Sequence, residues 1–337
     1  MTTSIASTLA VVHSDDYAGW VFNSLHPTQG RRFVNAMARL RELAPAAGVD
    51  LLDIDSDLLL GAETLALVHD PDYVEQVIIE GLSGEWSGSR PDLGRIAQRM
   101  AGGTLLAAQV LVAGGALTAV HFAGAKHHAM RDHSSGFCVF NDFALTAKML
   151  LDDPTNWIDR ICILDIDAHH GDGVEALLQS DSRVQTFSVH DSTIFPGTGR
   201  EDTPASHVFN RPLPSEAGDR ELSECIRDFV EAAHFFDPEM IMIAMGADGH
   251  AADPLSSLQY SVEGMARGVR HVRRAFPTTP ILLGGAGGYQ PDTITPEAWA
   301  RMTLAAAQPV EDKLFTGCVT QIPWEISAVE VSNDEPG

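Results

Sequence analysis

The chain has 337 residues, 45% of them hydrophobic and 20% charged, a composition that excludes an intrinsically disordered or fibrous protein. It carries 46 Asp and Glu against 22 Lys and Arg, a formal net charge of −24, which disfavours binding to the phosphates of nucleic acid. This acidity suits cationic partners such as lysine-rich protein tails or polyamines, or it is simply a solvated surface that aids solubility.

The cysteines and the N-terminus indicate a cytoplasmic protein. The four cysteines form no CxxC pair, and the first residues lack the basic region of a signal peptide before a strand-like run at Leu9–His13. The segment from Gly102 to Ala125 has no charged residue and is long enough to span a bilayer. Because Gly114-Gly115 interrupts it, we expect a buried helix, a glycine turn and a buried strand instead, and no membrane partner.

Farther along, short apolar runs alternate with helical patterns. The expected strands are Leu117–Phe122, Ile161–Ile166, Val184–Val189, Met240–Met245 and Ile281–Leu283. The expected helices are Val174–Ser180, Arg220–Phe235, Val262–Ala275 and Pro296–Ala307, and Ser83–Asp92 is an expected surface loop. This alternation predicts the α/β class, with one open parallel sheet, helices on both faces, and functional residues beyond the carboxyl ends of the strands. We predict one domain over residues 1–328 and a frayed acidic tail at 329–337.

The strand expected at Ile161–Ile166 leads into alternating polar residues. Asp165, Asp167 and His169 share one face if the strand geometry persists to its end. That much buried negative charge requires a cation, and carboxylates with an imidazole suit Zn²⁺ or another divalent transition metal. The alternative is an acidic turn with a stray histidine.

A second strand end supplies Asp248, which can join Asp167 and His169 as a third ligand or can cap a helix. Two Asp and one His leave a coordination position open for water, a pattern typical of a catalytic metal site.

A third strand end carries the tandem His127-His128. These histidines can be metal ligands, a structural pair, or a general acid/base pair. Because the metal already has three candidate ligands, we favour the acid/base pair. Asp165 and Asp172 are available as carboxylate partners that orient the rings.

Two glycine-rich stretches, at Phe195–Gly199 and Gly284–Gly288, match neither nucleotide-binding pattern. Each can be a plain surface turn. The second ends at Tyr289, and a glycine run there can instead bring the backbone close to a site, where the tyrosine hydroxyl could polarise a bound carbonyl oxygen.

Together these motifs resemble those of the zinc-dependent histone-deacetylase family, on the arginase–deacetylase fold. The resemblance covers about Asp15 to Gln308 and includes His26-Pro27, Gly136-Phe-Cys, Phe195-Pro-Gly-Thr-Gly and the motifs described above. Gly171 stands where arginases carry a further Asp, which favours the deacetylase branch and one metal. The segments after Asp248 and around Trp299 look most similar to bacterial acetoin-utilisation deacetylases.

The resemblance implies a metal site and a cation site. The zinc ligands would be Asp167, His169 and Asp248, with Fe²⁺ as the alternative metal. A structural monovalent cation, usually K⁺, would be held at Asp165, Asp167, His169, Ser188 and Val189.

The resemblance also implies the catalytic and substrate-binding residues. His127 would pair with Asp165, His128 would pair with Asp172, and Tyr289 would hydrogen-bond the substrate carbonyl. Gly136, Phe137 and Phe195 would line an apolar slot for the acyl-lysine stem.

The implied activity is metal-dependent hydrolysis of an N-acetyl amide, releasing acetate and a free amine. Protein acetyl-lysine is the favoured substrate, an acetylpolyamine or another small acetylated amine is the alternative, and the complete set of site residues argues against a non-catalytic acyl-lysine reader. An oligomer is compatible with the sequence.

Two departures from the family pattern bear on substrate recognition. Ala286 interrupts the glycine run and Gly284 replaces the usual Leu, which predicts a differently shaped Tyr289 loop. The Gly84–Arg95 region is shorter than in eukaryotic enzymes, which carry there an Asp that grips the substrate backbone. Asp92 is our loose candidate for that residue.

Overall fold

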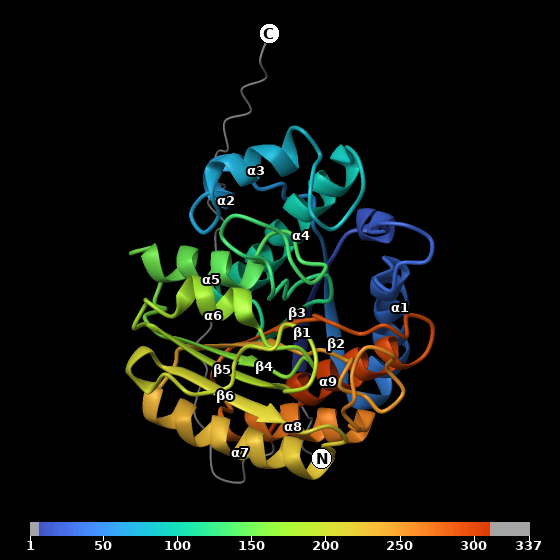
Figure 1. The fold of residues 1–337 in the computed structure, drawn as a ribbon. Helices are drawn as coiled ribbons and strands as arrows, with labels where there is room; N and C mark the ends of the chain where they lie inside the picture. The colour runs from blue at the N-terminus through green and yellow to red at the C-terminus, as the bar shows by residue number, and fades with distance from the viewer. Residues whose placement is uncertain (1–6, 311–337) are drawn as a thin grey trace.

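The computed structural model describes residues 7–310, through which runs a sheet of eight parallel strands (Figure 1). The strands are β1 (Ser7–His13), β2 (Val49–Asp55), β3 (Thr118–His121), β4 (Ile161–Asp165), β5 (Val184–Asp191), β6 (Val208–Leu213), β7 (Met240–Ala244) and β8 (Ile281–Gly284). Their order is β2-β1-β3-β8-β7-β4-β5-β6, and each neighbouring pair is parallel. The predicted open parallel sheet is confirmed.

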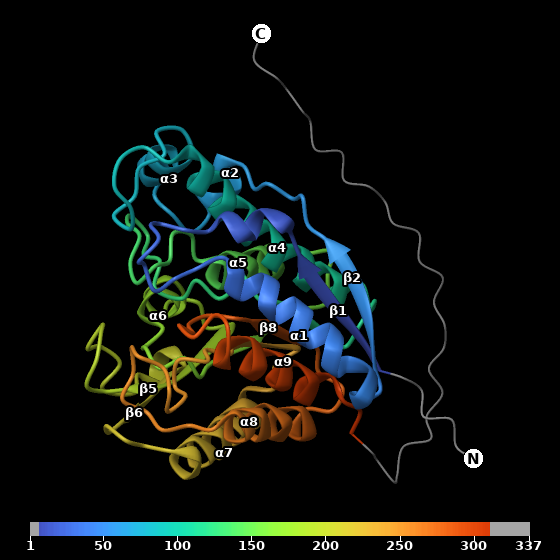
Figure 2. The ribbon, with the colours of Figure 1, turned by 90° about the vertical axis from the view of Figure 1, so that its right-hand side faces the viewer.

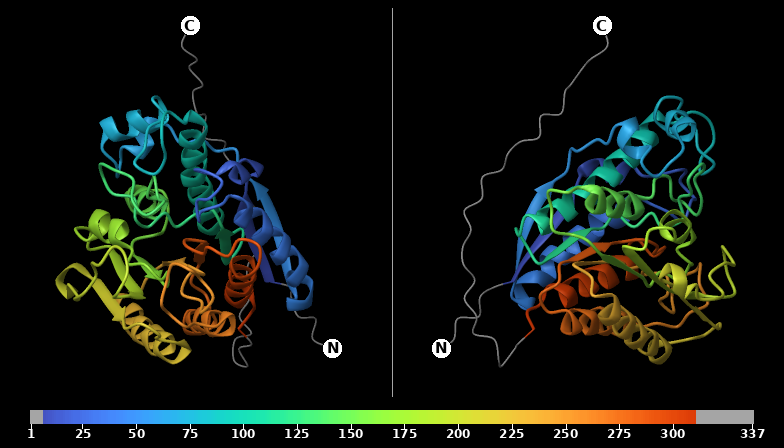
Figure 3. Two further views of the ribbon diagram at one scale, coloured as in Figure 1. Left: turned by 45° about the vertical axis from the view of Figure 1, so that its right-hand side comes forward. Right: turned by 90° about the vertical axis from the view of Figure 1, so that its left-hand side faces the viewer.

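Helices cover both faces of the sheet, also as predicted. They are α1 (Arg31–Ala47), α2 (Ala62–Leu65), α3 (Pro71–Ile78), α4 (Pro91–Val112), α5 (Asp142–Asp152), α6 (Asp172–Leu178), α7 (Asp219–Phe236), α8 (Val262–Ala275) and α9 (Ile294–Ala307). Figure 2 and Figure 3 show α1, α7, α8 and α9 on one side of the sheet and α4, α5 and α6 on the other. Short 3-10 helices lie at Asp15–Gly19 and Pro204–Ser206.

The central strands alternate their side chains between two hydrophobic cores. In β7, Ile241 and Ile243 pack in the core that includes α7, α8 and α9, whereas Met240 and Met242 pack in the core that includes α5 and α6. A strand buried on both faces has a continuous apolar sequence. For this reason the sequence alone located β3, β4, β5, β7 and β8 to within a few residues.

The sequence did not predict the edge strands or the N-terminal helices. β2 alternates apolar residues with three aspartates and is partly exposed, and β6 contains Arg211 and Pro212. Both lie at the ends of the strand order, where only one neighbour is needed and polar side chains reach water.

The segment between Gly102 and Ala125 contains the end of α4, a turn with Gly114 at φ +73°, and β3, as predicted. Within residues 7–310, no helix is both long and apolar enough to cross a membrane.

The expected surface loop Ser83–Asp92 needs correction at two points. Helix α4 begins at Pro91, because proline is favoured in the first helical turn, so the loop ends at Arg90. Trp86 within the loop is buried, with its ring 6.2 Å from Trp20 and 5.6 Å from Phe22. The acidic tail predicted at 329–337 lies outside the described residues, as does the end of the predicted domain.

The strand order determines where polar residues meet. β3, β8, β7 and β4 are consecutive neighbours, so the segments that follow their carboxyl ends leave the sheet at one edge. These segments contain His127, His169, Asp248 and Tyr289.

Candidate active site

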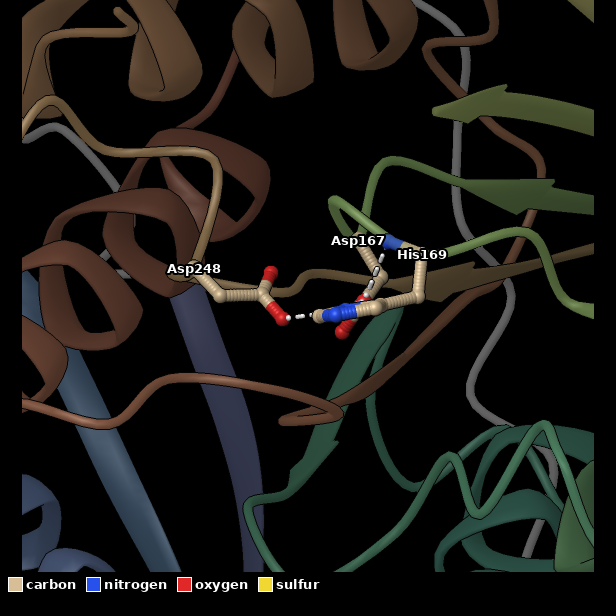
Figure 4. Close-up of side chains that lie close together, drawn as sticks. All are labelled: Asp167, His169 and Asp248. Carbon is tan, nitrogen blue, oxygen red and sulfur yellow. Dashed lines mark hydrogen bonds and ion pairs between the residues drawn. The ribbon is translucent and has the colours of Figure 1, made fainter. Parts of the chain in front are cut away.

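Asp167, His169 and Asp248 come together after β4 and β7 as predicted (Figure 4). Their ligand atoms all lie within 4.8 Å of one another, and the three residues are buried. His169 Nδ1 is 3.0 Å from Asp167 Oδ1 and 3.0 Å from Asp248 Oδ2. Two carboxylates and one imidazole converging in the interior form a donor set that suits Zn²⁺ or Fe²⁺.

Backbone N–H groups hold the carboxylates in this arrangement. Gly287 donates to Asp167 Oδ2 at 2.6 Å, and Ala168 donates to Asp248 Oδ1 at 2.9 Å. A Cβ atom at Gly287 would lie 2.1 Å from Asp248 Oδ2, so only glycine lets the chain after β8 pass this close. The other carboxylate oxygens, Asp167 Oδ1 and Asp248 Oδ2, face His169, so the three side chains form a group that could hold a metal ion.

The tandem histidines pair with the predicted carboxylates. His127 Nδ1 donates to Asp165 Oδ2 at 2.6 Å, and His128 Nδ1 donates to Asp172 Oδ1 at 2.7 Å. Their ring centroids are 4.0 Å apart, and the His128 ring is 5.9 Å from that of His169. Each carboxylate keeps Nε2 of its histidine oriented away from the Asp.

The two histidines differ in charge. Burial disfavours the imidazolium of His127, but Asp165 and Asp167 outweigh burial and raise its pKa to about 9. Burial and the neighbouring His127 charge lower the pKa of His128 to about 4, although Asp172 acts in the opposite direction. At neutral pH, His128 is therefore the neutral partner, able to accept a proton, and His127 is the charged one.

Tyr289 lines the same cavity as His128 and His169 and is anchored through its backbone. Its N–H donates to Asp253 Oδ2 at 2.8 Å, and Arg32 donates to the carbonyl of Gly288 at 3.1 Å. Burial, Asp248 and Asp167 raise the pKa of the phenol well above its usual range, so it stays protonated and can donate a hydrogen bond. The loop departs from regular structure at Ala286, which adopts φ +57°.

A cavity of about 390 Å³ leads to these groups, and its walls include the predicted aromatic pair. The lining residues are His128, Gly136, Phe137, His169, Ile194, Phe195, Leu255 and Tyr289. The Phe137 ring is 5.9 Å from Tyr289, and the Phe195 ring is 5.0 Å from His128. Apolar walls with polar groups only at the inner end suit a flexible alkyl chain that ends in an amide.

The left-handed turn at Gly136–Phe137 places the first wall. Gly136 has φ +54° and Phe137 φ +66°, and a Cβ at Gly136 would lie 2.3 Å from the His128 ring. The Phe137 N–H donates to Glu85 Oε2 at 3.0 Å. Glu85 is therefore the carboxylate beside this wall, whereas Asp92 lies in the first turn of α4 and pairs with Arg90.

The residues predicted for a monovalent cation also lie close together. The register of β4 and β5 places Asp165 opposite Ser188, and Val189 follows on the same strand. The Ser188 hydroxyl lies 3.0 Å from His190 Nδ1.

Sequence reasoning missed several supporting residues. Asp142 is fully buried and accepts the backbone N–H groups of Ala125 and Lys126, at 2.8 and 2.6 Å, directly before the histidine pair. Asp253 was visible as a third polar residue after β7, but its role on the Tyr289 backbone depends on a contact between distant segments. Arg32 and Glu85 carried no local signal.

Comparisons with known proteins agree with this site. A family model described as histone deacetylase domain matches residues 26–306. The chain is 30% identical to the acetoin utilization protein AcuC of Staphylococcus aureus (strain MRSA252), over 90% of this chain and 83% of that protein. It is 31% identical to AcuC of Bacillus subtilis (strain 168), over 87% of this chain and 80% of that protein.

The matched range, residues 26–306, spans all the strand ends that form the site. The chain therefore belongs to the histone deacetylase family, and it is a hydrolase of the deacetylase type.

Proposed function

We propose that this deacetylase removes the acetyl group from acetyl-lysine in proteins. The observation that carries the proposal is the chemistry of the slot. Among the described residues that line it, the walls are aromatic and aliphatic, and no Asp or Glu faces the region between the rim and the histidines. The uncharged methylenes of a lysine side chain match such walls.

The small-amine alternative fits less well. An acetylated polyamine carries its nearest ammonium three or four methylenes from the amide nitrogen, about where acetyl-lysine has its Cα. That charge would lie at the rim of the slot, and no Asp or Glu is among the residues that line the cavity. The net charge of −24 would attract either substrate, so it does not favour one of them.

Each site residue has its own role in the proposed reaction. His128 accepts the proton of the attacking water and later donates a proton to the leaving amine, while the charged His127 stabilises the developing negative charge. The Tyr289 hydroxyl donates to the oxyanion of the tetrahedral intermediate. Asp167, His169 and Asp248 would hold the divalent metal, which when bound polarises the amide carbonyl and acidifies a nearby water.

A second cation belongs to the same proposal. We expect K⁺ near Asp165 and Ser188, where it would offset part of the buried negative charge beneath the divalent metal. We also propose a cytoplasmic location, in keeping with the cysteine usage.

The proposal is tested by comparing turnover of an acetyl-lysine peptide, N-acetylputrescine and an N-acetylspermidine, with and without a chelator. We expect chelator-sensitive turnover to be fastest for the peptide and slower for both amines, whose ammonium would find no carboxylate among the residues that line the cavity. Faster turnover of either amine would favour the small-molecule function. Turnover of none of the three would refute acetyl amides of this shape as substrates.

A further inference from the structure

The Phe195 wall is part of a short loop that returns to the protein interior at two buried histidines. The hydroxyl of Thr198 donates to His170 Nδ1 at 2.8 Å, and His190 Nε2 donates to the carbonyl of Gly199 at 3.0 Å. The loop residues before these contacts carry the Phe195 ring to the slot, where it lies 5.0 Å from His128. These are the hydrogen bonds by which the segment from 195 to 199 is attached to the residues beneath it.

Further hydrogen bonds hold the two histidines, His170 through Glu175 of α6 and His190 through Ser188 of its own strand. His170 Nε2 donates to Glu175 Oε2 of α6 at 3.1 Å, and the same oxygen accepts from Asn210 of β6 at 2.9 Å. The Ser188 hydroxyl of β5 donates to His190 Nδ1 at 3.0 Å. Because the Glu175 carboxylate accepts from Nε2, a neutral His170 has its Nδ1 free to receive the Thr198 hydroxyl.

Steric contact adds to these hydrogen bonds. Gly199 has φ +68°, and a Cβ atom there would lie 2.5 Å from Cδ2 of His170. The loop backbone thus rests directly on the His170 ring, which is 2% exposed. His170 thus contacts the loop at Thr198 and Gly199, whereas the Nδ1 atom of the neighbouring His169 faces Asp167 and Asp248.

We propose that His170 is a positioning residue that acts through Thr198 on Phe195 and so determines how tightly the slot holds the substrate stem. This rests on the proposed function only in that the stem passes Phe195. A displaced Phe195 ring would weaken the packing of the substrate stem equally in the ground state and in the transition state. KM therefore changes more than kcat.

The test uses Thr198→Val, which keeps the side-chain shape and removes the hydroxyl. Changes at His170 itself are avoided because it adjoins His169. We expect Thr198→Val to raise KM about three- to tenfold, the effect of losing one hydrogen bond, with kcat within about twofold of wild type. Thr198→Ser, which retains the hydroxyl, should restore KM. Thr155→Val is the control, since its hydroxyl bonds Asp153 in an exposed turn.

A double-mutant cycle with Phe195→Ala decides whether Thr198 acts through the wall. We expect Thr198→Val to raise KM by less than about twofold when Phe195 is already absent. An equal rise in both backgrounds, an unchanged KM in the single variant, or a loss confined to kcat would overturn the inference. The cycle uses whichever substrate the wild-type enzyme cleaves fastest, so failure on acetyl-lysine would contradict the proposed function alone.

Discussion

The inner end and the rim of the slot are built differently. At the inner end, the carboxylates that could hold a metal accept backbone N–H groups, and the two histidines are bonded to a buried and a partly buried carboxylate. At the rim, Phe137 and Phe195 stand on loops, and Phe195 is half exposed.

The difference separates two functions. Sheet register holds the reacting groups, because strands that are hydrogen-bonded on both sides cannot shift independently. The loops can vary in sequence and shape without disturbing that register, so we expect the choice of substrate to depend on the rim. The first two predictions below concern the inner end, the third the rim, and the last the shared scaffold.

The largest effect is expected for the metal ligands. Asp248→Asn should lower turnover by about 10³-fold or more, because the loss of metal catalysis removes several kcal/mol of transition-state stabilisation. Elemental analysis should show a matching loss of bound metal. Asp228→Asn, a change of the same kind at an exposed carboxylate of α7, should leave both unchanged. If Asp248→Asn kept full metal content and full activity, Asp248 would not be a metal ligand.

Tyr289→Phe is expected to lower kcat about 10²–10³-fold, as does the loss of other oxyanion donors, with little change in KM. The matched control is Tyr260→Phe, which removes a buried hydroxyl that has no hydrogen-bond partner among residues 7–310. Steady-state kinetics of both variants separate the roles, and a kcat for Tyr289→Phe equal to that of wild type would refute the oxyanion assignment.

At the rim, Phe137→Ala should lower kcat/KM about tenfold, mainly through KM, since one or two methylenes of the stem lose their apolar contact. Phe235→Ala, at a phenylalanine that is 96% exposed on α7, is the control and should have no effect. If Phe137→Ala reduced kcat as strongly as Tyr289→Phe does, the division between rim and inner end would fail.

The last prediction concerns stability in acid, which is independent of catalysis. Burial lowers the pKa of His69 from 6.5 to about 4, while its Nε2 accepts from the backbone N–H of Asn141. Between these two pH values the unfolded chain binds a proton that the folded chain does not, so stability falls as pH decreases, by about 1.4 kcal/mol per pH unit. Below about pH 4 both states are protonated and this contribution no longer changes.

Urea unfolding at pH 6.5 and pH 4.5 measures this slope. His69→Gln can keep one donor and one acceptor but cannot titrate, so its stability should depend less on pH by that amount. His271→Gln, at an exposed position on α8, should keep the wild-type slope. Identical slopes for wild type and His69→Gln would show that His69 does not contribute.

Prediction from sequence succeeded where local pattern and chemistry coincide. β4 and β7 are apolar on both faces and are followed within a few residues by Asp and His, so both the strand and its role could be recognised together. The approach failed for β2 and β6, whose polar edge positions mimic loops, and for Glu85, which acts only because its loop lies against Phe137.

Sequence patterns sufficed for the fold class and the types of candidate ligand, because buried strands and metal-binding side chains have restrictive compositions that show in any single chain. The pairing of each histidine with its carboxylate was implied by the family resemblance. Tertiary structure decided the rest. The strand order placed β7 between β4 and β8, which brought Asp248, Asp167 and the Gly287 backbone into contact. The same packing seated the Phe195 loop on His170. Contacts of this kind join residues far apart in the chain, and each depends on geometry that local sequence patterns do not encode.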